Sequence, residues 1–191
     1  LNDYIYLEAN EDYWRGAPEI DGILIKVVPD AETEKMLFDS GQIDIFDLDN
    51  ARHLIPEYTE SDEWKDNIVS KITLGTSYLS INENIEPFDD VRVRKALQMA
   101  IDRDTIREEM YEGTGENANG IYPPGLTGYN ENLEEIPYDP EAAKELLAEA
   151  GYADGFDMTI TQTADDSSTL ELNEIIQAQL AEIGVNVTIE Q

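Results

Sequence analysis

Acidic side chains crowd into residues 44–50, a spacing that could bind a cation. The segment reads DIFDLDN and carries four oxygen ligands of the kind that Ca²⁺ prefers: Asp44, Asp47, Asp49 and Asn50. An EF-hand loop starting at Asp47 would need glycine five residues later and glutamate eleven residues later. The chain has Arg52 and Tyr58 at those positions. The sequence therefore predicts no dedicated calcium loop, and we expect no metal cofactor there.

Residue types that support nucleophilic or zinc chemistry are scarce. The chain has one histidine, His53, and no cysteine, so neither a thiolate nucleophile nor a usual zinc set is available. The sequence contains no G-x-S-x-G turn that would expose a serine nucleophile. Among 43 acidic residues some pair lies at glycosidase spacing by chance, so such pairs carry no signal. We expect no enzymatic activity, with a secreted carboxylate-pair hydrolase as the alternative.

The segment GTGENA, residues 113–118, matches the G-x-G-x-x-A dinucleotide fingerprint. That fingerprint works only between a strand and a helix, where phosphate meets the helix N-terminus. Here the pattern predicts a helix before it and a loop rich in Gly, Pro and Asn after it. We therefore interpret residues 113–137 as a long loop and expect no cofactor.

The formal net charge of −31 makes phosphate backbones and anionic membranes poor partners, so we expect no nucleic acid to bind. No apolar run is long enough to span a bilayer. Five of the 12 cations nevertheless fall within residues 87–107: Arg92, Arg94, Lys95, Arg103 and Arg107. We expect these cations to pair with acidic neighbours, and Arg94, at the border of an apolar face, to form a bidentate pair.

The first third of the chain alternates strand and helix patterns. We predict strands over 4–10, over 23–29 (largely buried) and over 42–46, and a short helix with a loop within 50–67. Asp30 is the expected N-cap of a helix whose Met36 and Leu37 face inward and which Gly41 ends.

The pattern of strands and helices in the rest of the chain predicts an α/β fold. Residues 72–82 form the longest β-like run. Helices are expected after Asp89 or Asp90, after Asp102 or Asp104, and after Asp139. The first of these helices has five predicted inward positions: Val93, Ala96, Leu97, Ala100 and Ile101. A strand, a helix over about 169–183, Gly184 and a last strand predict a right-handed parallel βαβ unit.

Four stretches in this order resemble a known family: EANEDYWRGAPEIDGILIKVVPDAETEKMLFDSGQIDI, TSYLSINENIEPFDDVRVRKALQMAIDRDTI, YDPEAAKELLAEAGY and IQAQLAEIGVNVTIE. The sequence is similar to the substrate-binding proteins of peptide- and nickel-type ABC importers, also called extracellular solute-binding family 5. The resemblance covers nearly the whole chain. It implies a type II periplasmic binding protein fold, α/β and two-lobed, of which this chain is an internal part.

The resemblance also implies the domain organisation and the partners. Residues 1–73 would be the second half of the first lobe and 74–191 the first half of the second lobe, with 72–82 as the crossing strand. The implied function is capture of short peptides outside the cytoplasmic membrane, in the periplasm or at its extracellular face, for delivery to permease subunits. A lipid anchor would lie outside this chain. A nickel chelate or an oligosaccharide is the alternative solute, and permease docking the alternative role for the cation cluster.

Carried over position by position, the resemblance names three ligand-lining candidates. Tyr78 matches a tyrosine that faces the ligand in oligopeptide binders. Thr73 and Asp47 occupy pocket-edge positions that are tyrosines in such binders. A hinge would include Leu74, Gly75 and Thr76, where glycine lowers the cost of a φ/ψ change. The family's main ligand contacts lie in regions that this chain lacks.

Overall fold

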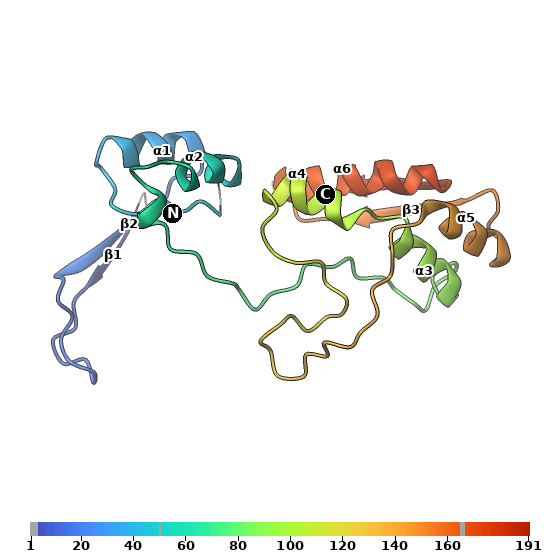
Figure 1. Cartoon of the computed structure of the whole chain (residues 1–191), viewed down its shortest axis with the longest axis horizontal. Coiled ribbons are helices and arrows are strands. Elements are labelled where there is room, and N and C mark those ends of the chain that lie inside the picture. The colour runs from blue at the N-terminus through green and yellow to red at the C-terminus, as the bar shows by residue number, and fades with distance from the viewer. Residues whose placement is uncertain (1–3, 50, 165–166) are drawn as a thin grey trace. The chain divides into compact units, whose positions relative to one another are not determined.

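The computed structural model describes residues 4–49, 51–164 and 167–191, and the chain divides into two compact units, 1–66 and 67–191 (Figure 1). Unit 1 contains strands β1 (Tyr4–Glu8) and β2 (Gly22–Lys26), helices α1 (Ala31–Asp39) and α2 (Ile55–Thr59), and the 3₁₀ turn η1 (Arg52–Leu54). A second 3₁₀ turn, η2 (Lys65–Asn67), spans the boundary between the units in the sequence. Unit 2 contains helices α3 (Val91–Met99), α4 (Arg103–Tyr111), α5 (Pro140–Glu149) and α6 (Ser167–Glu182), and strands β3 (Phe156–Thr161) and β4 (Val185–Glu190).

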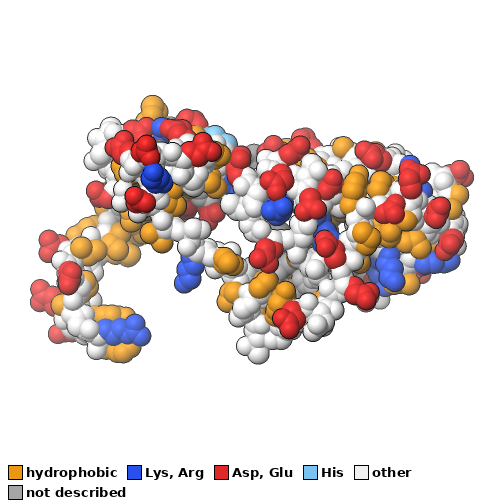
Figure 2. Space-filling view, in the orientation of Figure 1, with side chains coloured by type: hydrophobic (Ala, Val, Ile, Leu, Met, Phe, Trp, Pro, Cys, Tyr) orange, Lys and Arg blue, Asp and Glu red, His pale blue; other side chains and the backbone are white. Residues whose placement is uncertain are grey.

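In unit 1, β1 and β2 form an antiparallel hairpin in which Tyr4 faces Lys26 and Glu8 faces Gly22. The prediction that the second strand is largely buried was wrong, because Leu24 is 53% exposed and Ile25 44% exposed. The sheet has only two strands, and a two-stranded ribbon cannot bury side chains on both of its faces without another layer. Figure 2 shows hydrophobic side chains along this hairpin.

The centre of unit 1 is a small aromatic cluster rather than a sheet. Phe38 lies 5.0 Å from Trp64 and 5.8 Å from Phe46 between ring centroids, and Tyr58 completes the group. Residues 42–46, predicted as a strand, form none in the described structure. No partner strand is paired there, and Phe46 contributes its ring to the cluster instead.

Helix α1 begins where the sequence predicted, because Asp30 Oδ1 accepts a hydrogen bond from Thr33 N at 2.8 Å. The predicted inward orientation of Met36 was wrong, since this side chain is 63% exposed. Leu37 is half-buried. The helix directs Phe38 toward the aromatic cluster, so its apolar face lies slightly off the predicted one.

Unit 2 has a continuous hydrophobic core between its helices and the parallel pair β3–β4. Residues paired across the two strands alternate between the core and solvent: Ile160, Val185 and Val187 are buried, whereas Thr159 and Thr188 are exposed. Of the inward positions predicted on the first helix, Val93, Ala96, Leu97 and Ala100 are buried, and Ile101 is half-buried against the same core.

Aspartates begin three helices of unit 2. The backbone amides of Arg92, Thr105 and Ala142 donate to Asp90, Asp102 and Asp139 respectively, at 2.8–3.0 Å. The caps of α3 and α4 are therefore Asp90 and Asp102, and not Asp89 or Asp104. The turn after α6 requires Gly184, which has φ +82° and lies so close to Gly155 that a Cβ on Gly155 would clash with its carbonyl oxygen.

Residues 72–82, predicted as a crossing strand, form no strand in the part of the chain that the structure describes. The segment 72–79 is largely exposed, and a strand cannot form without a partner to accept its hydrogen bonds. The two compact units divide between Asp66 and Asn67. Within the described residues, no helix is long and apolar enough to cross a membrane.

Candidate ligand-binding segment

The predicted ligand-lining residues lie on two different parts of the chain. Thr73 and Tyr78 both belong to the exposed segment 72–79 of unit 2, where the Tyr78 side chain is 68% exposed. Asp47 belongs to unit 1, where its Oδ1 accepts a hydrogen bond from Asp49 N at 3.0 Å and its own N–H donates to Glu34 Oε1 at 3.4 Å. The Asp47 carboxylate therefore also organises its own loop.

Segment 72–79 offers backbone hydrogen-bonding groups. No backbone hydrogen bond links these residues to any other described part of the chain. Unpaired N–H and C=O groups along an extended segment can pair with an extended peptide, while alternate side chains fill pockets. The Tyr78 side chain adds an apolar ring with a hydroxyl at its tip.

The three predicted hinge residues lie within the same segment. Leu74 is 57% exposed and Thr76 half-buried. A Cβ built on Gly75 would meet nothing within 4 Å, and its φ is not in the left-handed region. Nothing in this conformation therefore requires glycine at this position. Its contribution would be conformational freedom.

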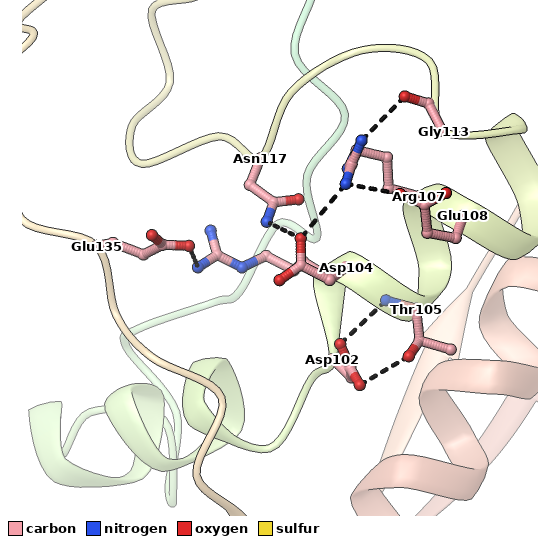
Figure 3. Close-up of polar contacts among 9 residues, drawn as sticks. Asp102, Asp104, Thr105, Arg107, Glu108, Gly113, Asn117 and Glu135 are labelled. Carbon is pink, nitrogen blue, oxygen red and sulfur yellow. Dashed lines mark hydrogen bonds and ion pairs between the residues drawn. The ribbon is translucent and has the colours of Figure 1, made fainter.

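A polar cluster at α4 anchors the long loop 113–137 (Figure 3). Arg103 donates to the carbonyl oxygens of Ala118 and Ile136 at 2.7 and 2.8 Å, close to the two ends of the loop. Arg107 donates to the carbonyl of Gly113 at 2.9 Å. Asn117 Nδ2 donates to Asp104 Oδ1 at 2.9 Å. Arg103 and Arg107 also form the predicted pairs with acidic side chains, Glu135 and Asp104. No sequence signal marked the carbonyl contacts of the anchor, because every residue carries a carbonyl.

The hollow beside this cluster is too small to hold a solute. Its volume is about 20 Å³, which corresponds to about one water molecule. Tyr138 lines it, and burial, with Glu182 and Asp102 nearby, raises the pKa of the Tyr138 hydroxyl. A space of this size cannot admit a peptide.

The remaining cations of the cluster also hold the scaffold. The prediction of a bidentate pair at Arg94 was wrong, because Arg94 donates to the backbone carbonyls of Phe88 and Asp89. The bidentate pair forms instead between Arg92 and Asp90, and the hydrogen bonds from Arg92 lower the pKa of Asp90. Lys95 is exposed and makes no ion pair with any residue that the structure describes.

The histidine and the acidic segment show no metal-binding geometry. His53 Nε2 lies 3.0 Å from Glu32 Oε1 on an exposed surface. Across residues 4–49, 51–164 and 167–191, no three metal-ligating side chains come together. Asn50, which the sequence analysis named with Asp47 and Asp49, lies outside the described residues.

The chain is similar in sequence to a group of bacterial binding proteins. The family model of bacterial extracellular solute-binding proteins, family 5 middle, matches residues 1–191. Heme-binding protein A of Haemophilus influenzae is 36% identical over 93% of this chain and 32% of its own length. The dipeptide-binding protein of Escherichia coli is 31% identical over 97% of this chain and 35% of its own length. The chain thus spans about a third of the relatives that it matches.

A solved structure extends the likeness to the fold. The ABC transporter-associated periplasmic binding protein DppA from Helicobacter pylori, in complex with peptide STSA, superposes with a TM-score of 0.76. It is 32% identical, and the match covers 98% of this chain and 36% of that one. This neighbour has the type II periplasmic binding protein fold, which confirms the predicted fold class and the interpretation of the chain as part of a two-lobed structure.

Proposed function

The chain belongs to family 5 of the bacterial extracellular solute-binding proteins, and we propose from this membership that it forms part of the receptor of an ABC importer for short peptides. The receptor would capture its solute outside the cytoplasmic membrane and deliver it to permease subunits. A lipid anchor, if the protein has one, would lie outside this chain. The relatives named above are binding proteins, which supports a non-enzymatic role at the level of the family.

One observation carries the peptide assignment. Segment 72–79 is largely exposed, and its backbone groups form no backbone hydrogen bond with any described residue. Peptides of any sequence share a backbone, so a receptor that bonds to that backbone can accept many side chains. The similarity to a dipeptide-binding protein and to a structure solved with a bound peptide supports this interpretation. In this proposal Tyr78 lines the pocket, and Thr73 and Asp47 lie at its edge.

Residues 74–76 would act as the hinge of lobe closure, and residues 1–73 and 74–191 would contribute to different lobes. One feature of the segment supports this assignment: a Cβ on Gly75 would meet nothing within 4 Å, so the backbone there can move without a clash. A hinge needs residues that change φ and ψ without breaking packed contacts.

The decisive test is to identify the natural solute. The intact protein that carries this chain is purified without denaturation, then denatured, and the released small molecules are identified by mass spectrometry. A series of short mixed peptides is the expected result. A single non-peptide species would overturn the peptide assignment and leave the family membership intact.

The 191-residue chain alone is expected to bind peptides poorly. It spans about a third of its relatives, and the remaining part of such a protein would supply further contacts. Titration calorimetry with mixed di- to tetrapeptides should show no saturable heat. A micromolar isotherm would contradict this expectation and would place the main contacts within these residues.

A non-peptide solute is the second candidate, because the relative at 36% identity is named a heme-binding protein. A heme or a metal chelate would appear as one species in the same mass spectrum. It would also raise the thermal midpoint of the intact protein on addition, since a ligand that binds the native state stabilises it.

A further inference from the structure

Loop 113–137 contains two successive β-turns of the same type. In the first, Leu126 N donates to Pro123 O at 3.2 Å, with Pro124 second and Gly125 third. In the second, Tyr129 N donates to Leu126 O at 3.0 Å, with Gly128 third. Both glycines have positive φ, +88° and +97°. These are the requirements of type II turns, in which glycine occupies the third position.

The two turns differ in what surrounds them. A Cβ built on Gly125 would lie 3.2 Å from Leu74 Cδ2, whereas a Cβ built on Gly128 would meet nothing within 4 Å. The first turn therefore packs directly against a side chain of segment 72–79, and the second does not. Figure 1 shows the loop and this segment passing each other within unit 2.

The loop is held firmly enough to act on its neighbour. Arg103 fixes the carbonyls of Ala118 and Ile136, on either side of the double turn, and its side chain is only 29% exposed. Hydrogen bonds from a charged donor are stronger than those between neutral groups. The loop is thus tied to α4 outside the turns (Figure 3), and within the first turn the ring of Pro124 fixes its φ.

We propose that the turn at Gly125 is a positioning surface for the hinge, against which Leu74 rests, and that the Arg103 anchor holds this turn in place. The inference rests on the hinge assignment at residues 74–76 made above. Because Gly75 itself is unconstrained, the contact at Leu74 sets which backbone conformations the hinge populates. Gly125 and Arg103 are then positioning residues and contact no solute.

The test compares two substitutions that introduce the same backbone strain. Gly125→Ala and Gly128→Ala each place a Cβ at positive φ, which is unfavourable for an L residue. Only Gly125→Ala also presses on Leu74. Spin labels are attached to the intact protein without solute at Glu60→Cys and Glu145→Cys, two exposed positions in different units. Double electron–electron resonance then gives the distribution of distances between the two labels.

Gly125→Ala is expected to shift the distance distribution relative to that of the wild type, and Gly128→Ala to leave it unchanged. In a Leu74→Ala background the two variants should become indistinguishable, because the pressed methyl group is gone. Arg103→Lys keeps the charge but removes the planar guanidinium fork, whose two terminal nitrogens each donate to one carbonyl. This substitution should broaden the distribution. Equal distributions for the two glycine variants, with Leu74 present, would overturn the proposal.

The design separates this proposal from the peptide assignment. The distance distributions are measured without solute, so they test the Gly125–Leu74 contact whatever the receptor binds. Addition of the released solute tests lobe closure independently. If that solute is not a peptide while the two glycine variants still differ, the peptide assignment fails and the positioning role of Gly125 stands.

Discussion

The two units differ in how many hydrophobic side chains they bury. Among its described residues, unit 2 buries thirteen hydrophobic side chains in one core built from its own helices and strands. Unit 1 buries three, Ala51, Leu54 and Tyr58, among its described residues, while its hairpin keeps large apolar side chains exposed. A patch of that kind usually marks a surface that another layer covers. The comparison indicates that unit 2 carries most of the stability of this chain, and unit 1 depends on further contacts.

The largest expected effect is the loss of stability of unit 2 when a side chain in its core is truncated. Leu180 is 1% exposed, and Leu180→Ala should destabilise unit 2 by about 3 kcal/mol, through lost burial and the cavity left behind. Urea unfolding followed by circular dichroism detects mainly the helices of unit 2. Both tryptophans, Trp14 and Trp64, lie in unit 1, so tryptophan fluorescence follows unit 1 alone and should not change.

The matched control is Leu24→Ala on the exposed hairpin. This substitution removes the same atoms from a side chain that is already half in solvent, so its cost should stay below about 1 kcal/mol. If the two leucine substitutions cost the same, the contrast between the units is wrong.

The next effect comes from the charge that both units share. At a net charge of −31 the carboxylates repel one another in the compact state, and salt screens this repulsion over about 10 Å at 0.1 M and about 3 Å at 1 M. Raising NaCl across this range should raise the thermal midpoints of both transitions by several degrees, because about 1 kcal/mol corresponds to roughly 4–8 °C in a small domain. Unchanged midpoints would mean that the carboxylates are already compensated.

A smaller effect concerns the helix caps. Hydrogen bonds from Arg92 lower the pKa of Asp90, and hydrogen bonds from Thr33 lower that of Asp30. A carboxyl with a lowered pKa in the folded state contributes stability above its unfolded pKa of about 3.9 and loses it as the pH falls through the folded value. Asp90→Asn should therefore lower the thermal midpoint of unit 2 at pH 7 and have little effect near pH 2.

Asp30→Asn is the corresponding change in unit 1 and should act in the same direction on tryptophan fluorescence. Its effect should be smaller, because Asp30 accepts from neutral groups only, whereas Asp90 also accepts from the Arg92 guanidinium. A midpoint difference between Asp90→Asn and wild type that stays constant from pH 7 to pH 2 would contradict the role of the ionised carboxylate.

The smallest effect is expected at Tyr58, in the aromatic cluster of unit 1. Its ring is 5% exposed, its hydroxyl is buried without a hydrogen-bond partner among the described residues, and burial raises its pKa. Tyr58→Phe removes an unsatisfied polar atom and keeps the ring, so stability should stay within about 0.5 kcal/mol of wild type or rise. A loss above about 1 kcal/mol, measured by tryptophan fluorescence, would show that the hydroxyl has a partner in solution.

Much of unit 2 followed from local sequence signals. The start of α5 is marked by Asp139 followed by Pro140, and the end of α6 by Gly184. Both signals act within a few residues. The positions of the buried face of α3 followed from spacings of three and four residues. The candidate binding residues were reached only through the family resemblance, because an exposed tyrosine such as Tyr78 has no local signature of binding.

The failures share one cause. Residues 23–29 and 42–46 have strand-like composition, but whether a strand forms and is buried depends on partners distant in the chain. The same holds for 72–82, whose β pattern is real but unpaired among the described residues. The Arg103 anchor was missed because its acceptors are backbone carbonyls, which every residue carries and no sequence distinguishes.

The sequence by itself determined the helix limits to within a few residues, the α/β class, the family and the excess of negative charge, because each depends on neighbouring residues or on composition. Only the tertiary structure decided which arginines bind which carbonyls and which side chain of the hinge segment meets Gly125. Arg103 and Ala118 are 15 positions apart in the sequence, and Leu74 and Gly125 are 51 positions apart. Such contacts form only when hydrophobic burial elsewhere has brought the segments together.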